Sequence, residues 1–280
     1  MVCCLSKTNL IAKENSWARI NELGLHIEEL VLDGKNILKK SEDGHQTHGG
    51  CAFLIPYANR IRNGSYYLGN ERYELTRNAE GNSIHGFGKD LTWAIKKNTE
   101  GSIEGSCLAK GEGYPFDLQS AISMTIERTS LRIEMRFRNN DNKNIPLSPG
   151  AHPYFLISHD WKVHFESPIE EVEYAEKYFP NGNLLNVEEP ETSINGKTAW
   201  DNCFKGGGSI TLKDSLKSVI IKRINMGYFV MYNGIYSERK SVAIEPMVAP
   251  PDSFNNGISL VMLKPGEEFR CGFEIIIGPP

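Results

Sequence analysis

Hydrophobic and polar residues alternate along several stretches of this chain, a period of two that is typical of a strand with one buried face. In residues 131–138 every second position is apolar, and the positions between them are Arg or Glu. Residues 122–126 alternate in the same way, and a short polar connection joins the two stretches. We therefore expect these two segments to form an antiparallel hairpin.

A second hairpin is predicted for residues 65–68 and 71–75, because Gly69 and Asn70 between them suit a tight turn in which glycine accepts a positive φ. The same alternation predicts three further strands, at residues 218–224, 228–232 and 269–277. Strands therefore dominate the predicted structure.

Helical periodicity is scarce. Residues 169–178, acidic and aromatic and followed by Pro180, are the one stretch predicted to be a helix. No linker rich in Pro, Gly or Ser divides the 280 residues. We expect an all-β chain in which residues 1–280 form a single domain, built as a large antiparallel β-sandwich.

Composition and charge exclude several classes of protein. The chain has 31 Lys and Arg against 35 Asp and Glu, a net charge of -4, and no segment with the basic surplus that binding to nucleic acid requires. No apolar stretch is long enough to span a bilayer. We expect neither nucleic acid nor a membrane as a partner.

The cysteines are scattered and form neither a C-x-x-C pair nor a dense disulfide pattern. They are Cys3, Cys4, Cys51, Cys107, Cys203 and Cys271. The first residues lack the apolar run of an export signal. A reducing, cytoplasmic location fits these features best.

Three segments concentrate groups that can do chemistry. In the first, Arg60 can turn its donors toward ligand oxygens, and His85 stands before a glycine that allows close backbone approach. In the second, His152 stands between Ala151 and Pro153, where an imidazole can act as a general acid. Taken singly, a surface ion pair for Arg60 and a turn for each histidine explain these residues as well.

The third segment ends an apolar run with Glu245, and a carboxylate at the end of a buried strand is a candidate general base. Between the second and third segments, Asp201 lies beside Trp200 and close to Phe204. Sugars bind with ring faces on aromatic side chains and hydroxyls on carboxylates, although a turn is the ordinary explanation for such an Asp.

Together these motifs resemble the aldose 1-epimerases, or galactose mutarotases, and they occur in the same order. The resemblance rests on Asn59-Arg60-Ile61, Tyr66, Tyr73-x-Leu75, Asn82, His85-Gly86, His152-Pro153-Tyr154-Phe155, Asp201 with Phe204, and Glu245 followed by residues 250–256. Two positions depart from the family pattern, because Ala151 replaces an asparagine and Phe87 a glycine. The preference for galactose or glucose therefore does not transfer.

The resemblance implies a sandwich of the galactose mutarotase type that interconverts the α and β anomers of a hexose without cofactor or metal. By similarity, Glu245 is the base that takes the proton of the anomeric hydroxyl and His152 the acid that protonates the ring oxygen. Arg60, His85 and Asp201 match the positions that bind sugar hydroxyls.

Three alternatives stay open. A hexose-6-phosphate 1-epimerase needs cations for the phosphate, for which Arg60, Arg62 and Arg72 are candidates. A non-catalytic carbohydrate-binding protein on the same fold would not need an acid and a base together. A metal-dependent hydrolase would use His45 and His48, but their glycine-rich flanks predict a loop and no third ligand is near in the sequence.

Overall fold

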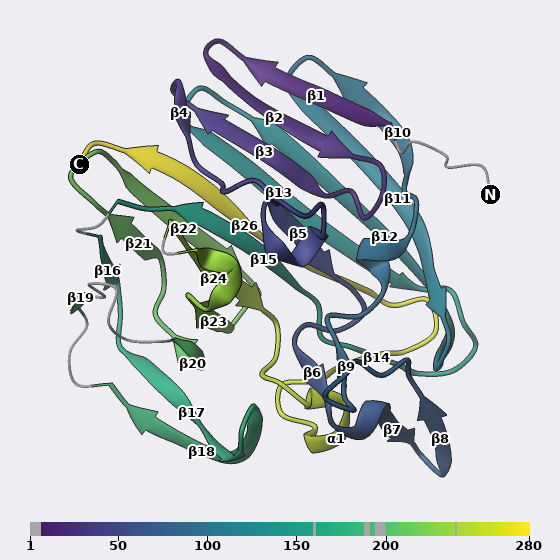
Figure 1. Ribbon diagram of the computed structural model, residues 1–280. Helices are drawn as coiled ribbons and strands as arrows, with labels where there is room; N and C mark the ends of the chain where they lie inside the picture. Colours follow the sequence, from purple (N-terminus) through teal and green to yellow (C-terminus); the bar gives the residue numbers. More distant parts are fainter. Residues whose placement is uncertain (1–6, 159–160, 188–190, 194–199, 239) are drawn as a thin grey trace.

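The chain folds into two large antiparallel sheets that pack face to face (Figure 1). The computed structural model describes residues 7–158, 161–187, 191–193, 200–238 and 240–280. Cys3 and Cys4 lie outside these residues, and the four cysteines within them are free. Within the described part of the chain, no helix is long and apolar enough to cross a membrane.

The first sheet has eleven strands, and its middle strands carry most of the residues discussed below. In spatial order these are β1 (Thr8–Lys13), β2 (Ser16–Asn21), β3 (Ile27–Leu32), β5 (Cys51–Leu54), β15 (Gly150–Leu156), β24 (Ser241–Met247), β23 (Tyr228–Tyr232), β20 (Asp201–Gly206), β17 (Ile169–Glu176) and β18 (Phe179–Asn186), with β4 (Lys35–Asn36) paired to β3.

The second sheet has nine strands. They are β10 (Ala94–Thr99), β11 (Ser102–Gly111), β12 (Tyr114–Ile126), β13 (Ser130–Asn139), β26 (Glu268–Gly278), β22 (Ser218–Ile224), β21 (Ile210–Lys213), β16 (Lys162–Phe165) and β19 (Glu191–Ser193).

Short elements complete the chain. Three two-stranded sheets pair β6 (Arg60–Ile61) with β9 (Ser83–Ile84), β7 (Ser65–Leu68) with β8 (Glu71–Glu74), and β14 (Ile145–Leu147) with β25 (Val261–Leu263). The helical turns are η1 (Gln46–His48), η2 (Arg62–Gly64), η3 (Gly88–Asp90), η4 (Ile235–Ser237) and α1 (Ser253–Asn256).

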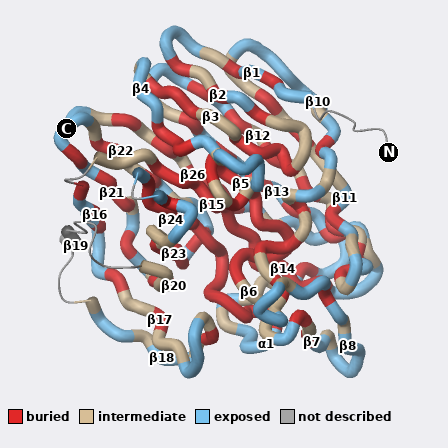
Figure 2. The backbone as a smooth tube through the Cα atoms, in the orientation of Figure 1, coloured by how far each residue is buried: buried red, intermediate tan, exposed pale blue. Residues whose placement is uncertain are grey.

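The alternating pattern of the sequence explains how the two sheets meet. Ile133 and Phe273 point inward from the nine-stranded sheet, and Phe155 and Ile244 point inward from the eleven-stranded sheet, all fully buried in one core. Figure 2 shows buried positions along the middle strands of the sandwich, while exposed ones gather at the hairpin ends. Burial of these inner faces is the main force that holds the sandwich together.

The predictions of strands are confirmed. β12 pairs with β13 and β7 with β8 as antiparallel hairpins, and strands occupy residues 218–224, 228–232 and 269–277. The predicted all-β class and the antiparallel sandwich are confirmed as well.

The predicted helix at residues 169–178 is wrong, because this segment forms β17 and pairs with β18 and β20. Its register shifts between Val172 and Tyr174, which indicates a bulge. Ile169 and Val172 are both buried, and their spacing of three imitates the repeat of a helix. Pairing with β18 and β20 therefore determines the structure of this segment, although its local pattern favours a helix.

Candidate active site

Two strands at the centre of the eleven-stranded sheet bring His152 and Glu245 together. β15 and β24 run antiparallel with Gly150 opposite Met247 and Tyr154 opposite Ala243, so His152 falls opposite Glu245. Both side chains leave the face of the sheet that points away from the core. His152 Nε2 lies 3.2 Å from Glu245 Oε1, and both residues are buried.

Arg60 and His85 reach the same place from the small β6–β9 sheet, in which Arg60 pairs with Ile84. Asn59 and His85 flank this pair with φ values of 56° and 61°, a left-handed conformation uncommon outside glycine. His85 N donates to Asn59 O at 2.9 Å, and Asn59 N donates to His85 Nδ1 at 3.3 Å. These bonds fix the imidazole, whose centroid lies 5.3 Å from that of His152.

Gly86 allows this segment to pack against Ile55, the residue that follows β5. A Cβ at this position would lie 2.2 Å from Ile55 O, and its φ is +57°. Only glycine therefore fits after His85, as close backbone approach requires.

Asp201 begins β20 and lies opposite Tyr232 of β23. The Tyr178 hydroxyl is close enough to lower the pKa of the Asp201 carboxyl group by hydrogen bonding, against the larger effect of burial. The Arg60 guanidinium stacks 3.6 Å from the centroid of the Tyr178 ring, and Arg60 Nε donates to Glu80 Oε2 at 2.9 Å. Tyr178 thus bridges two of the predicted binding residues.

A cavity of about 520 Å³ unites the five residues singled out from the sequence. All five line it: His152, Glu245, Arg60, His85 and Asp201. This volume is within the usual range for a small-molecule site, and the mixed aromatic and polar lining suits a polar ligand with apolar ring faces.

Burial shifts the titration of the groups at the base of this cavity. Burial raises the pKa of Glu245 well above its usual value; Asp201 adds to the rise and Arg60 opposes it. Burial lowers the pKa of His152 to about 3 and that of His85 well below its usual value. Burial likewise raises the pKa of Asp201, opposed by Arg60 and Tyr178. Burial therefore favours a protonated Glu245 beside a neutral His152.

Two atoms of this pair have no hydrogen-bond partner among the described residues. His152 Nδ1 and Glu245 Oε2 are buried and make no hydrogen bond to the described residues. A buried polar atom without a partner is costly, so such atoms in a cavity indicate a ligand that completes them.

One group of described residues has the composition of a metal site. Ligand atoms of His85, His152 and Glu245 lie within 4.8 Å of one another. His85 Nδ1 accepts the Asn59 amide proton, however, so the neutral ring carries its hydrogen on Nε2, the nitrogen left to face a ligand. That nitrogen is a donor, which suits a sugar oxygen and not a cation.

Several lining residues were missed from the sequence. Tyr154 stacks on His152 with centroids 4.7 Å apart, and Tyr178 and Glu80 hold Arg60. The run His152-Pro153-Tyr154-Phe155 contained the signal for Tyr154, since period two places residues 152 and 154 on one face. No local signal in the sequence indicated Tyr178, which lies in the turn between β17 and β18.

Other expectations change with the structure. His152 and Asp201 lie in strands, not in the turns that were their alternative explanation. Arg62 pairs with Glu176, and Arg72 pairs with Glu74 on the β7–β8 hairpin. Of the three arginines considered for a phosphate, only Arg60 lines the cavity.

The predicted loop with His45 and His48 contains the three-residue helical turn η1, of which His48 is the last residue and His45 the N-cap. Both histidines line the cavity and their rings stack with centroids 4.2 Å apart. Among the described residues, neither belongs to a group of three metal-ligating side chains.

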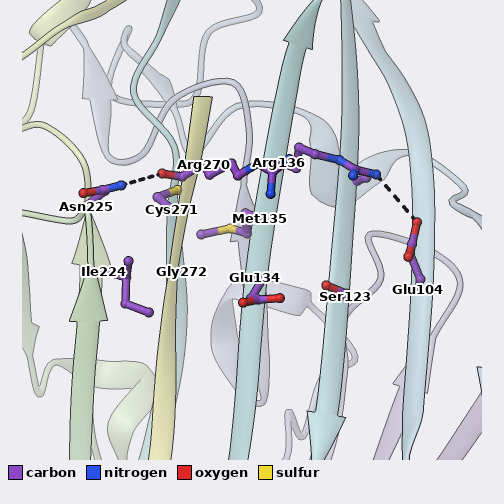
Figure 3. Close-up of a pocket in the computed structure, with 11 residues that line it drawn as sticks. Glu104, Ser123, Glu134, Met135, Arg136, Ile224, Asn225, Arg270, Cys271 and Gly272 are labelled. Atoms are coloured by element: carbon purple, nitrogen blue, oxygen red, sulfur yellow. Dashed lines mark hydrogen bonds and ion pairs between the residues drawn. The ribbon is translucent and has the colours of Figure 1, made fainter. Parts of the chain in front are cut away.

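A second hollow, of about 270 Å³, lies on the outer face of the nine-stranded sheet around Gly272 (Figure 3). Its charged side chains are exposed at least in part, and Arg136 lies 3.8 Å from Glu104 across the sheet. Figure 3 shows these side chains spread over neighbouring strands without converging on one point. We place the candidate active site in the cavity lined by His152 and Glu245.

The chain is similar to known proteins over nearly its whole length. Residues 7–275 match the family model described as aldose 1-epimerase. The uncharacterized protein YihR of Escherichia coli strain K12 is 28% identical over 290 residues, covering 97% of this chain and 94% of that protein.

Solved structures share the fold at low identity. A galactose mutarotase-like protein from Clostridium acetobutylicum superposes with a TM-score of 0.84 at 19% identity, covering 98% of this chain and 96% of that one. Galactose 1-epimerase from Lactobacillus acidophilus gives a TM-score of 0.78 at 17% identity, covering 98% and 99%. With the family model matched over nearly the whole length and the sandwich shared with these structures, the chain belongs to the aldose 1-epimerase family.

Proposed function

We propose that this protein is an aldose 1-epimerase that interconverts the α and β anomers of a free, unphosphorylated hexose. The observation that carries the proposal is the contact of 3.2 Å between His152 Nε2 and Glu245 Oε1 at the buried base of the cavity. The anomeric oxygen and the ring oxygen of a pyranose are both bonded to C1. An acid and a base that serve these two oxygens must therefore lie side by side, as His152 and Glu245 do.

In the proposed reaction, the pair moves one proton in each direction. Glu245 takes the proton of the anomeric hydroxyl while His152 gives one to the ring oxygen, and the C1–O5 bond breaks to leave an aldehyde. Rotation about the C1–C2 bond presents the other face of the aldehyde. The ring then closes as Glu245 returns its proton and His152 recovers its own.

The electrostatics of the cavity support a shared proton. After ring opening, Glu245 is protonated and His152 is neutral, which is the arrangement that burial favours. Hydrogen bonds from the sugar and the charge of Arg60 favour the opposite arrangement, with an ionised Glu245, which starts the reaction. The two arrangements differ only in which residue holds the proton.

The residues around the pair support hydroxyl recognition. His85 offers an Nε2–H donor, Asp201 a carboxylate acceptor and Arg60 further donors beyond its bond to Glu80. A phosphorylated sugar is less well served, because Glu80 already pairs with Arg60 and neither Arg62 nor Arg72 lines the cavity. A protein that only binds carbohydrate would not need the contact between His152 and Glu245.

Polarimetry of freshly dissolved α-glucose and α-galactose tests the proposal. We expect the protein to speed the approach to anomeric equilibrium at pH 7, and to act better on a free sugar than on its 6-phosphate. Saturable binding without any acceleration would favour the carbohydrate-binding alternative. A higher kcat/KM for the 6-phosphate would favour the hexose-6-phosphate 1-epimerase.

A further inference from the structure

His48 and Asp43 form a hydrogen-bonded pair at the edge of the cavity. His48 Nδ1 lies 2.7 Å from Asp43 Oδ2. The His48 side chain is 19% exposed and lines the cavity, whereas Asp43 is 57% exposed and does not line it. The ring edge that carries Nδ1 therefore faces outward to Asp43, and the opposite edge, which carries Nε2, faces the cavity.

Aromatic rings clamp the imidazole on both sides. The His48 ring stacks on Tyr236 of η4 with centroids 3.5 Å apart and an interplanar angle of 11°. His45 stacks on it at 4.2 Å and 22°. A ring held between two others has little freedom to turn, so the direction of its nitrogens is fixed.

The backbone around His48 is tied to the catalytic strand. The Tyr154 hydroxyl donates to Thr47 O at 2.9 Å, and Tyr154 also stacks on His152. Gly49 follows His48 where a Cβ would lie 2.3 Å from Ser41 N. His48 is thus held in a fixed position relative to His152.

Asp43 decides which nitrogen of His48 carries the hydrogen. Its Oδ1 accepts from the His45 amide at 2.9 Å, which leaves Oδ2 for His48. The hydrogen bond from His48 is the largest cause that lowers the pKa of Asp43, so the carboxylate is ionised and only accepts. In the tautomer that makes this hydrogen bond, the hydrogen lies on Nδ1 and Nε2 has a lone pair.

We infer that His48 determines specificity by accepting, at Nε2, a hydrogen bond from one free hydroxyl of the sugar. The inference rests on the proposed function, because it takes the ligand of the cavity to be a sugar. It assigns His48 the opposite polarity to His85, whose Nε2 donates. The substrate must therefore carry an unmodified hydroxyl at the position that faces η1, and a deoxy or O-methyl sugar at that position binds less well.

Two substitutions separate this role from a structural one. In His48→Asn the amide nitrogen lies near the position of Nδ1 and can keep the bond to Asp43, but no atom replaces Nε2. In His48→Gln the longer side chain can bring an acceptor oxygen to the position of Nε2. His164→Asn, on β16 of the other sheet, is the matched control.

The experiment measures KM and kcat for glucose, galactose and their monodeoxy and mono-O-methyl derivatives, with binding followed by calorimetry. We expect His48→Asn to raise KM about tenfold with kcat within about twofold, the effect of one lost hydrogen bond, and His48→Gln to restore KM to within about threefold. Wild type should discriminate about tenfold against one modified sugar, and His48→Asn should not.

The outcomes distinguish the two proposals. If the wild type interconverts anomers but His48→Asn keeps its KM and its discrimination, the role of His48 is wrong and the proposed function stands. Equal losses in the Asn and Gln variants, or a loss confined to kcat, also reject an acceptor at Nε2. A wild type that neither binds nor interconverts any of these sugars overturns both proposals.

Discussion

The outer faces of the two sheets differ although both are built from antiparallel strands. On the nine-stranded sheet, β13 alternates between buried and exposed residues, and the exposed Glu134 lines the hollow of Figure 3. On the eleven-stranded sheet, β24 is buried at all seven positions, and Glu245 is 3% exposed. The same residue type is thus exposed on one face, whereas on the other it is buried and its pKa is raised.

The elements that cover each face explain the contrast. β6, β9, η1, η4 and the β17–β18 hairpin all contribute residues to the cavity above β15 and β24. They exclude water from that face, which strengthens electrostatic interactions and shifts pKa values. A strand such as β24, which is buried on both faces and carries an ionisable residue, therefore indicates a candidate catalytic site.

Removing the acid or the base should give the largest effect. We expect Glu245→Gln and His152→Asn each to lower kcat by about a hundredfold or more, because each removes a positioned proton-transfer group. Polarimetry measures the rate, and circular dichroism checks that each variant is folded. Glu134→Gln is the matched control on the other sheet and should keep full activity. Normal turnover in Glu245→Gln or His152→Asn would show that the substituted residue does not transfer a proton in the reaction.

Arg60 should give the next largest effect. Arg60→Ala removes a donor from the cavity and leaves Glu80 without its partner, so we expect KM to rise about tenfold with a smaller change in kcat. Arg132→Ala, which affects an exposed pair with Glu274 on the other sheet, is the control. An unchanged KM in Arg60→Ala would show that Arg60 does not contact the sugar.

The contrast also shows what the sequence could predict. The alternating faces of β12, β13 and β26 could be read directly, because period two survives where one face meets water. His152 and Glu245 could be singled out because a histidine between Ala151 and Pro153 has a restricted backbone, and a carboxylate at the end of an apolar run is costly unless it is hydrogen-bonded or used. Their adjacency depends on the register of β15 and β24, which no local pattern contains.

The site residues whose roles the sequence did not predict lie in the elements that cover β15 and β24. Tyr178 lies in the β17–β18 hairpin, whose first strand was predicted to be a helix. Its ring contacts Arg60, which is far away in the sequence. His45 and His48 were noticed as a possible metal pair, but only the stack with Tyr236 and the bond to Asp43 reveal their orientation. Long-range contacts of this kind are fixed by tertiary packing and not by local sequence.

The substitution Glu245→Gln should raise the stability of the fold although it lowers activity. Its pKa is raised in the folded state, so its contribution to stability is full below the unfolded value of 4.5 and is lost as pH rises. Glu245→Gln does not titrate, and we expect it to be more stable than wild type by about 1–3 kcal/mol at pH 8, and by less at pH 5. Urea denaturation measures the difference. Glu134→Gln should change it little, and a Gln variant less stable than wild type at pH 8 would contradict the burial argument.

The pH profile should be flatter than that of an exposed histidine. Burial lowers the pKa of His152 to about 3 and raises that of Glu245, so the pair keeps one proton over the whole interval between them. We expect kcat/KM to show no acid limb near pH 6.5, where an ordinary imidazole would titrate. Stopped-flow polarimetry across this range provides the test, and an acid limb near 6.5 would mean that His152 is open to water.

Chelation should have the smallest effect of all. The ligand atoms of His85, His152 and Glu245 are close enough to suggest a metal, yet the bond from Asn59 makes His85 Nε2 a donor. We therefore expect activity to survive dialysis against EDTA unchanged, and added Zn²⁺ to give no increase. A large loss on chelation that Zn²⁺ restores would mean that His85 adopts the other tautomer. The covered face would then hold a cation where the proposed reaction needs a hydroxyl.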